Sequence, residues 1–151
     1  MAMTMSGAYQ LSAPREVVWA KLNDAEVLKA CIPGCEELEK VSDTEFRAVA
    51  KMKVGPVSAR FKGRVTLSEL DPPNGYKIAG EGEGGVAGFA KGGATVALAE
   101  QDGGTALTYN VEAQIGGKLA QLGQRLINGS AKKLADEFFS NFADAVQGKQ
   151  P

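Results

Sequence analysis

Hydrophobic and polar residues alternate through much of the chain between residues 36 and 115. The clearest run is 57–68, where the apolar or small positions are Val57, Ala59, Phe61, Gly63, Val65 and Leu67. The intervening positions are Ser58, Arg60, Lys62, Arg64, Thr66 and Ser68. A period of two is typical of a β-strand with one buried and one solvated face. The pattern therefore predicts an antiparallel sheet with one dry face.

Turn residues divide this region into six predicted strands. The breaks contain proline, which fixes φ, or Gly, Asn and Asp, which tolerate positive φ. They fall at Ser42-Asp43, Gly55-Pro56, 71–75 and 102–104. The expected strands are 36–42, 44–54, 57–70, 76–84, 94–100 and 105–115, and "SGAYQLSAP" (6–14) predicts an earlier one. Short connections make successive strands antiparallel neighbours.

A period near 3.6 predicts helices on either side of these strands. "PREVVWAKLND" and "AEVLKAC" predict two short helices, the second capped by Asn23 or Asp24 and stopped by Pro33-Gly34. Residues 114–142 predict one long amphipathic helix. This order is that of an α+β fold, in which a curved sheet of about seven strands wraps around the last helix. We expect a single domain over 1–147 and a short flexible tail at 148–151.

Small residues lie on faces that should be buried. Gly123 and Ser130 share the apolar stripe of the long helix, and Gly63, Gly80 and Gly82 lie on the dry side of the sheet. These residues allow either close helix-on-sheet packing or an unfilled apolar cavity. The residue pattern leaves both alternatives open. The candidate cavity residues are Phe61, Val65, Val96, Leu98, Tyr109, Leu119, Gly123, Ile127 and Ser130.

Composition limits the chemistry. The 151 residues carry a formal net charge of -1, so no basic field favours nucleic acid. The chain has no histidine, which removes the commonest general base and metal ligand. Cys31 and Cys35 are spaced C-x-x-x-C, and we expect two free thiols with no metal and no cofactor. The first residues lack the features of a secretory signal, so a cytoplasmic protein is expected.

A glycine motif and the charged residues are possible sites of chemistry. Gly80 to Gly85 matches G-x-G-x-x-G, but a strand follows and two glutamates would repel phosphate, so we reject a dinucleotide site. Strand parity directs the charged side chains to solvent, which disfavours catalysis. A small enzyme of the cyclase or hydrolase type acting on an apolar substrate is the alternative.

Two regions are candidates for surface roles. Phe139 and Phe142 widen the apolar stripe near the end of the long helix, which indicates either packing under the first helices or docking to a partner or membrane. The cavity needs an entrance, and the flexible Pro33-Gly34 turn and the 84–93 stretch, including Phe89, are the candidate gate.

Several segments together resemble the G-subunit family of carbon monoxide dehydrogenase. They are "APREVVWAKLND", "CIPGCEEL", "VGPVSARFKG", "DPPNGY", "GGVAGFAKGGATVAL" and "GGKLAQLGQRLINGSAKKLADEFF". The resemblance covers about Met5 to Phe142. It implies the helix-grip fold of the START-like superfamily, with an elongated apolar cavity between sheet and long helix.

The resemblance also implies a functional setting. Members of the family are associated with a molybdenum-flavin carbon monoxide dehydrogenase or a related hydroxylase, and with its recruitment to the membrane. Many continue into a linker and an apolar C-terminal segment, and anchoring by that route is not expected after "FADAVQGKQP". We therefore expect a non-catalytic, lipid-binding adaptor in the cytoplasm, with peripheral contact at the inner face of the membrane. The candidate ligand is an isoprenoid quinone.

Overall fold

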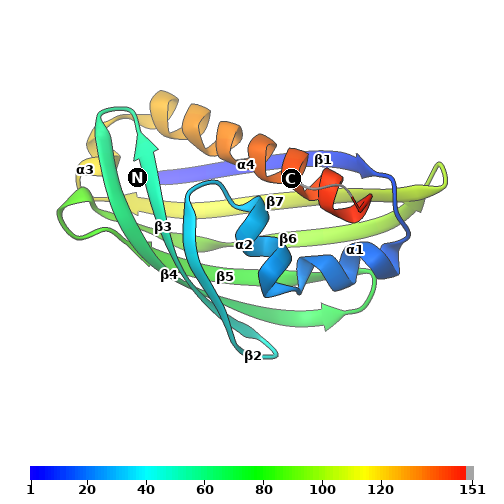
Figure 1. The fold of residues 1–151 in the computed structure, drawn as a ribbon. Helices are drawn as coiled ribbons and strands as arrows, with labels where there is room; N and C mark the ends of the chain where they lie inside the picture. The colour runs from blue at the N-terminus through cyan, green and yellow to red at the C-terminus, as the bar shows by residue number, and fades with distance from the viewer. Residues whose placement is uncertain (149–151) are drawn as a thin grey trace.

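The computed structural model describes residues 1–148, so most of the predicted tail at 148–151 lies outside the described residues. Seven strands form one antiparallel sheet in the order β1-β7-β6-β5-β4-β3-β2 (Figure 1). The strands are β1 (Ala2–Leu11), β2 (Cys35–Ser42), β3 (Glu45–Val54), β4 (Val57–Asp71), β5 (Gly75–Glu83), β6 (Phe89–Gln101) and β7 (Gly104–Gly116). The chain order of strands and helices is the α+β order predicted from the sequence.

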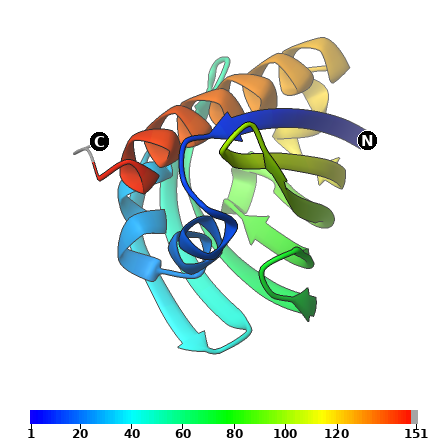
Figure 2. The ribbon, with the colours of Figure 1, turned by 90° about the vertical axis from the view of Figure 1, so that its right-hand side faces the viewer.

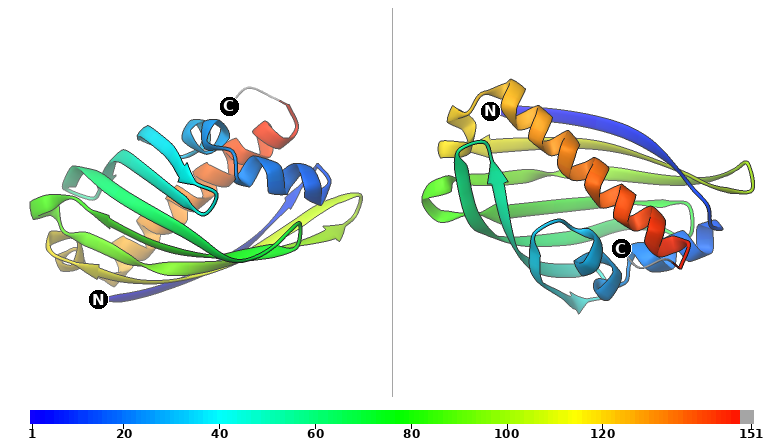
Figure 3. Two further views of the ribbon diagram at one scale, coloured as in Figure 1. Left: turned by 90° about the horizontal axis from the view of Figure 1, so that it is seen from below. Right: turned by 45° about the horizontal axis from the view of Figure 1, so that its top comes forward.

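The helices cover one side of this sheet. They are α1 (Arg15–Leu22), α2 (Ala25–Cys31), the single 3-10 turn η1 (Gly85–Ala87), α3 (Lys118–Gln121) and α4 (Gln124–Val146). The sheet curves around the long helix α4, which crosses its concave side (Figures 2 and 3). Asp24 caps α2 by accepting a hydrogen bond from the Glu26 backbone N–H at 2.9 Å, as expected for an aspartate at that position.

Strand alternation is as predicted. We call the side of the sheet toward α4 the inner face and the opposite side the outer face. On β4 and β7 the inner positions are buried or half-buried, whereas Ser58 to Ser68 and Thr108 to Gln114 expose every second residue on the outer face. The tight turn between β6 and β7 has positive φ at both Asp102 (52°) and Gly103 (79°), the geometry that a two-residue hairpin requires.

Element boundaries differ from the sequence prediction in three places. β1 begins at Ala2 and β6 at Phe89, each several residues earlier than expected. In β6, Gly92 and Gly93 lack the side chains that reveal alternation. The helix predicted over 114–142 is wrong in its first part, since β7 runs to Gly116 and α3 follows. Gly123 has φ 90° and stands at the N-cap of α4, so it is not an interior helix residue.

The connections lie at two opposite ends of the sheet. We call one end the tip: it holds the β3–β4 turn, the η1 loop between β5 and β6, and the β7–α4 connection with α3 (Figure 1). The other end, the base, holds the β2–β3, β4–β5 and β6–β7 turns and the junction of β1 with α1. Strand direction alternates in an antiparallel sheet, so successive turns necessarily alternate between these ends.

The buried core consists of two separate clusters. The larger one joins α1, α2 and the end of α4 to the base half of the sheet, with Val18, Leu107 and Phe142 fully buried. The smaller one closes the tip with Met3, Ile115, Leu119 and Ile127. A helix packed tightly along its whole length would give one continuous cluster. The fully buried residues are therefore interrupted under the middle of α4, where the half-buried Val111 packs against both clusters.

Candidate ligand-binding site

The inner face between the two clusters is apolar yet incompletely buried. The half-buried inner positions are Met52, Ala59, Phe61, Gly63, Val65, Ile78, Gly80, Gly82, Ala94, Val111 and Ala113. The facing stripe of α4, Ser130, Ala131, Leu134, Ala135 and Phe138, is also half-buried. Side chains directed toward each other from both layers, but not fully covered, indicate space between the layers. We call this space the inner chamber.

Three glycines distinguish open space from tight packing. A Cβ built on Gly82 meets only Lys62 O at 3.6 Å and Gly63 Cα at 3.9 Å within 4 Å. A Cβ on Gly80 or Gly63 likewise meets only atoms of the neighbouring strand, at 3.4 Å or more. No atom of α4 comes within that range of any of the three. These glycines therefore do not serve close helix packing, and they form a smooth floor for the inner chamber.

The position of α4 accounts for this space. The helix has close backbone neighbours on β1, β3 and the two short helices α1 and α2. At the tip, the exposed Leu126 lies against the β3–β4 turn, because a Cβ on Gly55 would be 2.6 Å from Leu126 Cδ2. Helix α4 is thus supported along its edges and at its ends, while β4, β5 and β6 lie farther beneath it.

The predicted lining residues fall into three groups. Phe61, Val65 and Ser130 are half-buried and border the inner chamber. Val96, Leu98 and Tyr109 are at most 8% exposed in the base cluster, and Leu119 and Ile127 are 6% exposed in the tip cluster. Gly123 lies at the start of α4 with no atom within 4 Å of its built Cβ. Their contact with a ligand remains a prediction.

The gate residues do not come together as predicted. Gly34 lies against β3, where its carbonyl accepts a hydrogen bond from Lys51 N at 2.9 Å. The η1 loop instead contacts β4 and α3. Phe89 is 47% exposed, and its ring covers Gly116, where a Cβ would be 2.1 Å from Phe89 Cε1. Because Ala90 takes the inner position, Phe89 points to the outer face. A gate role for Phe89 stays a prediction.

The phenylalanines at the end of α4 pack within the fold, which was one of the two alternatives for them. Phe142 is 0% exposed and stacks on Phe138 at 5.8 Å between ring centroids. Phe139 is half-buried and stacks on Tyr9 at 4.3 Å and Tyr109 at 5.5 Å. Phe139 attaches α4 to β1 and β7, and Phe142 is buried, so the two rings do not form a surface patch. The helical wheel did not reveal this, because Tyr9 on the edge strand β1 and Tyr109 on β7 cover Phe139 near the polar side of α4.

A polar contact supports the same attachment. The Tyr9 hydroxyl donates a hydrogen bond to Asp136 Oδ1 at 2.5 Å, and Lys132 Nζ donates to Asp136 Oδ2 at 3.0 Å. The hydrogen bond from Tyr9, then that from Lys132, lowers the pKa of Asp136. Partial burial, with the carboxylate beside it, raises the pKa of Tyr9. The group holds α4 against β1 at the surface, outside the inner chamber.

The thiols are free, as expected. Cys31 is fully buried, and burial raises the pKa of its thiol. Cys35 is half-buried, and desolvation raises its thiol pKa as well. Within residues 1–148, no three His, Cys, Asp or Glu side chains are grouped as a metal site would require. None of the helices in this range has the length and apolar character needed to cross a bilayer.

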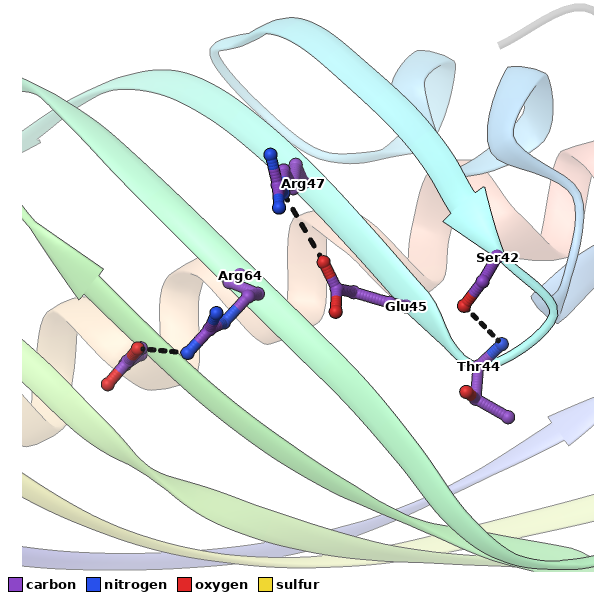
Figure 4. A network of polar contacts seen from close by, with 6 residues as sticks. Ser42, Thr44, Glu45, Arg47 and Arg64 are labelled. Carbon is purple, nitrogen blue, oxygen red and sulfur yellow. Dashed lines mark hydrogen bonds and ion pairs between the residues drawn. The ribbon is translucent and has the colours of Figure 1, made fainter.

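Two open grooves lie on the outer face, away from the inner chamber. One, of about 470 Å³, is bordered by charged residues and Phe89, and the other, of about 610 Å³, runs over β1, β5, β6 and β7. Many of these charges are paired: Arg64 with Glu81 at 3.0 Å and Arg47 with Glu45 at 3.3 Å (Figure 4). The outer face is therefore a solvated sheet surface, in agreement with the predicted strand parity.

Sequence reasoning missed several residues that border the inner chamber. Met5, Ile78, Val111, Ala113 and Leu134 are half-buried on the inner side. For Val111 and Ala113 the signal was present, because they alternate with exposed residues on the last strand. The sequence pattern does not show how far α4 lies from the sheet. That distance decides whether an inner side chain packs against α4 or faces open space.

Comparison with solved structures identifies the fold. A conserved protein from Geobacillus kaustophilus is 32% identical, and the match covers 97% of this chain and 96% of that chain with a TM-score of 0.90. A protein from Rhizobium leguminosarum is 15% identical over 99% of this chain and 97% of its own, with a TM-score of 0.76. The Zhui aromatase/cyclase from a Streptomyces species is 13% identical over 97% and 94%, with a TM-score of 0.70. At the lower identities the likeness shows the helix-grip, START-like fold alone.

The sequence comparison identifies the family. No curated protein matches the chain. The model for the G subunit of carbon monoxide dehydrogenase (CoxG) matches residues 7–147, from the middle of β1 to just beyond the end of α4. This range includes the glycine floor, the half-buried stripe of α4 and the buried residues of both core clusters except Met3. The chain therefore belongs to the G-subunit (CoxG) family of carbon monoxide dehydrogenase.

Proposed function

We propose that this protein is a non-catalytic carrier that holds an isoprenoid quinone, or a closely similar neutral lipid, in the inner chamber. The observation that carries the proposal is the glycine floor, because Gly63, Gly80 and Gly82 leave space where a closed core would place side chains. The surrounding inner positions supply apolar contacts. A long flexible hydrocarbon chain fits such a surface without directional bonds.

The lining favours a neutral ligand over a fatty acid. None of the half-buried inner positions that border the inner chamber, on the sheet or on the stripe of α4, is Asp, Glu, Lys or Arg. A buried carboxylate without a cationic partner is costly, whereas a quinone carbonyl needs only a hydrogen-bond donor or water. Ser130 supplies the one hydroxyl on that stripe. The same absence of acid and base groups argues against a cyclase or hydrolase, although the Streptomyces aromatase/cyclase shares the fold.

The family name supplies the partner that we propose. The family is described as a subunit of carbon monoxide dehydrogenase. We propose that the ligand accepts electrons from a molybdenum-flavin dehydrogenase of this type and that the protein moves the ligand between this enzyme and the membrane. Catalysis would then belong to the enzyme, and this chain would supply binding and transport.

A competition experiment tests the ligand class. Trp19 packs against Tyr76 at 5.2 Å in the base cluster, so its fluorescence reports on binding to the inner chamber. A short-tailed isoprenoid quinone should quench Trp19 in a saturable way, and a fatty acid of similar length should displace it poorly. Equal displacement by the fatty acid would contradict the neutral-ligand assignment. Failure of the quinone to quench, together with failure of a neutral isoprenoid alcohol to bind, would contradict the carrier function.

A further inference from the structure

Charge is strongly segregated between the tip and the base. The tip segments 51–62, 82–92 and 114–126 contain seven basic residues and one acidic residue, Glu83. The basic residues are Lys51, Lys53, Arg60, Lys62, Lys91, Lys118 and Arg125. The base segments 11–26, 42–46, 68–77 and 97–107 contain nine acidic and three basic residues. The net charge of the whole chain is only -1, because the basic tip and the acidic base nearly cancel. The two ends differ in charge because alternate turns of an antiparallel sheet lie at opposite ends.

The basic side chains of the tip are accessible. All seven are exposed, and of these seven only Arg60 has an ion-pair partner within residues 1–148, Glu36 at 2.7 Å. Lys62 and Lys91 border the outer-face groove of about 470 Å³ together with Phe89. Glu81 of this groove is held by Arg64 at 3.0 Å, so Glu83 is the carboxylate left to oppose the two lysines.

Apolar side chains protrude among these charges. Val86, on η1, is 84% exposed, which is the largest exposure of any large hydrophobic residue in the described chain. Phe89, at the start of β6, is 47% exposed, and Leu126, at the start of α4, is 38% exposed. Exposed apolar side chains therefore lie at two of the three tip connections, the β5–β6 loop and the β7–α4 connection. Exposure of this kind costs free energy in water unless another surface covers it.

We propose that the tip docks on a lipid bilayer that contains anionic phospholipids, with Val86 inserted at the interface and the basic residues on the phosphate groups. Val86 and Leu126 do not line the outer-face groove of about 470 Å³, so they present no shaped pocket to a folded partner. A fluid surface needs no shape complementarity, and it attracts cations while accepting apolar side chains at the headgroup boundary. The acidic base is repelled by the same surface, which orients the molecule.

This docking face gives the proposed carrier a short route to the membrane, and in that respect it rests on the proposed function. Leu119, which belongs to the tip cluster with Ile127, lies on α3, and α3 contacts the η1 loop. A lipid leaving past α3 would therefore enter the bilayer without crossing water. The face lies at the opposite end of α4 from Phe142, where the sequence had placed docking.

Vesicle flotation tests the docking face. The full chain is mixed with vesicles of phosphatidylcholine alone or with about one third phosphatidylglycerol, at low and high salt. We expect binding only to the anionic vesicles, weakened at high salt. Val86→Asp should lower the bound fraction at least several-fold, and the triple change Lys62→Gln, Lys91→Gln and Lys118→Gln should do the same. Val41→Asp is the matched control, because Val41 is also exposed (43%) but lies on β2 away from the tip, and it should bind as the unchanged protein does.

The outcomes separate this proposal from the carrier function. Unchanged flotation by both tip variants, or no binding to anionic vesicles at all, would overturn the docking face. If the tip variants still bind vesicles but no longer bind a purified acidic protein partner, the face would be a docking site for that protein. This result would also overturn the proposal. Quinone quenching of Trp19 should persist in Val86→Asp. Loss of quenching in every variant and in the unchanged protein would instead refute the carrier, with flotation still deciding the docking face.

Discussion

Gly63 on β4 and Gly82 on β5 are direct partners in the sheet, and a Cβ on either one would meet no atom of α4. Two glycines side by side in a strand pair weaken the sheet, since each gives up side-chain packing and conformational restriction. The two glycines lie under the middle of α4, between the two core clusters. We interpret the stability that they cost the sheet as the cost of keeping this region open. The pair keeps the inner chamber open.

Filling the floor should separate stability from binding. Gly82→Leu places a side chain in open space, so we expect the free energy of unfolding to stay equal or to rise by about 0.5 kcal/mol, while ligand binding falls. Denaturant unfolding and quinone quenching measure the two effects. Gly92→Leu is the control, because its Cβ would lie 2.1 Å from Glu112 O; it should cost about 1–3 kcal/mol. A comparable loss for Gly82→Leu would show that the site is packed.

Attachment of α4 should weaken in acid. The pKa of Asp136 is lowered by hydrogen bonds from Tyr9 and Lys132. A lowered folded-state pKa contributes stability that is complete above the unfolded value of about 4 and is lost as pH falls through the folded value. Thermal unfolding from pH 7 to pH 2 should therefore show a smaller acid-induced decrease for Asp136→Asn than for the unchanged protein. Parallel curves would mean that this contact adds nothing to stability.

Thiol labelling should report burial. Cys31 is 0% exposed and Cys35 is half-buried, and burial raises the thiol pKa of both. At pH 7 we expect slow alkylation of Cys35 and none of Cys31 in the folded protein, followed by labelling of both after unfolding without a reductant. Mass spectrometry of the alkylated peptides checks this. Labelling of Cys31 as fast as Cys35 in native conditions would contradict the packing of α2 against α4.

Ligand transfer should require contact with the acceptor. The inner chamber is apolar, so release of its ligand into water is unfavourable. The rate of quinone transfer to acceptor vesicles should therefore rise with vesicle concentration, and Val86→Asp should slow it without altering the folded state. A rate independent of the acceptor would indicate release into solvent and would contradict delivery by docking.

Most of the fold could be predicted from local sequence patterns. The candidate site could not, because it depends on the distance between α4 and the sheet. Alternation at 57–68 and turn residues such as Asp102-Gly103 specified strands, faces and hairpins, because strand parity and turn geometry are local. The sequence could place Gly63 and Gly82 on the inner face but left both packing and space open, since the height of α4 is set by distant contacts such as Phe139 with Tyr9. The same contacts favour packing for Phe139, whereas the helical period left packing and docking open. Gly123 was misread because a helical period continued across a residue with φ 90°.

Native mass spectrometry of the protein, purified without detergent, tests the carrier assignment most directly. We expect one bound neutral isoprenoid lipid per chain, released on collisional activation and identified by its mass. We expect no such lipid on Gly82→Leu prepared in parallel. A bound fatty acid or phospholipid would contradict the neutral-ligand assignment. Protein free of lipid that also fails to acquire a quinone from quinone-loaded vesicles would contradict the carrier function itself.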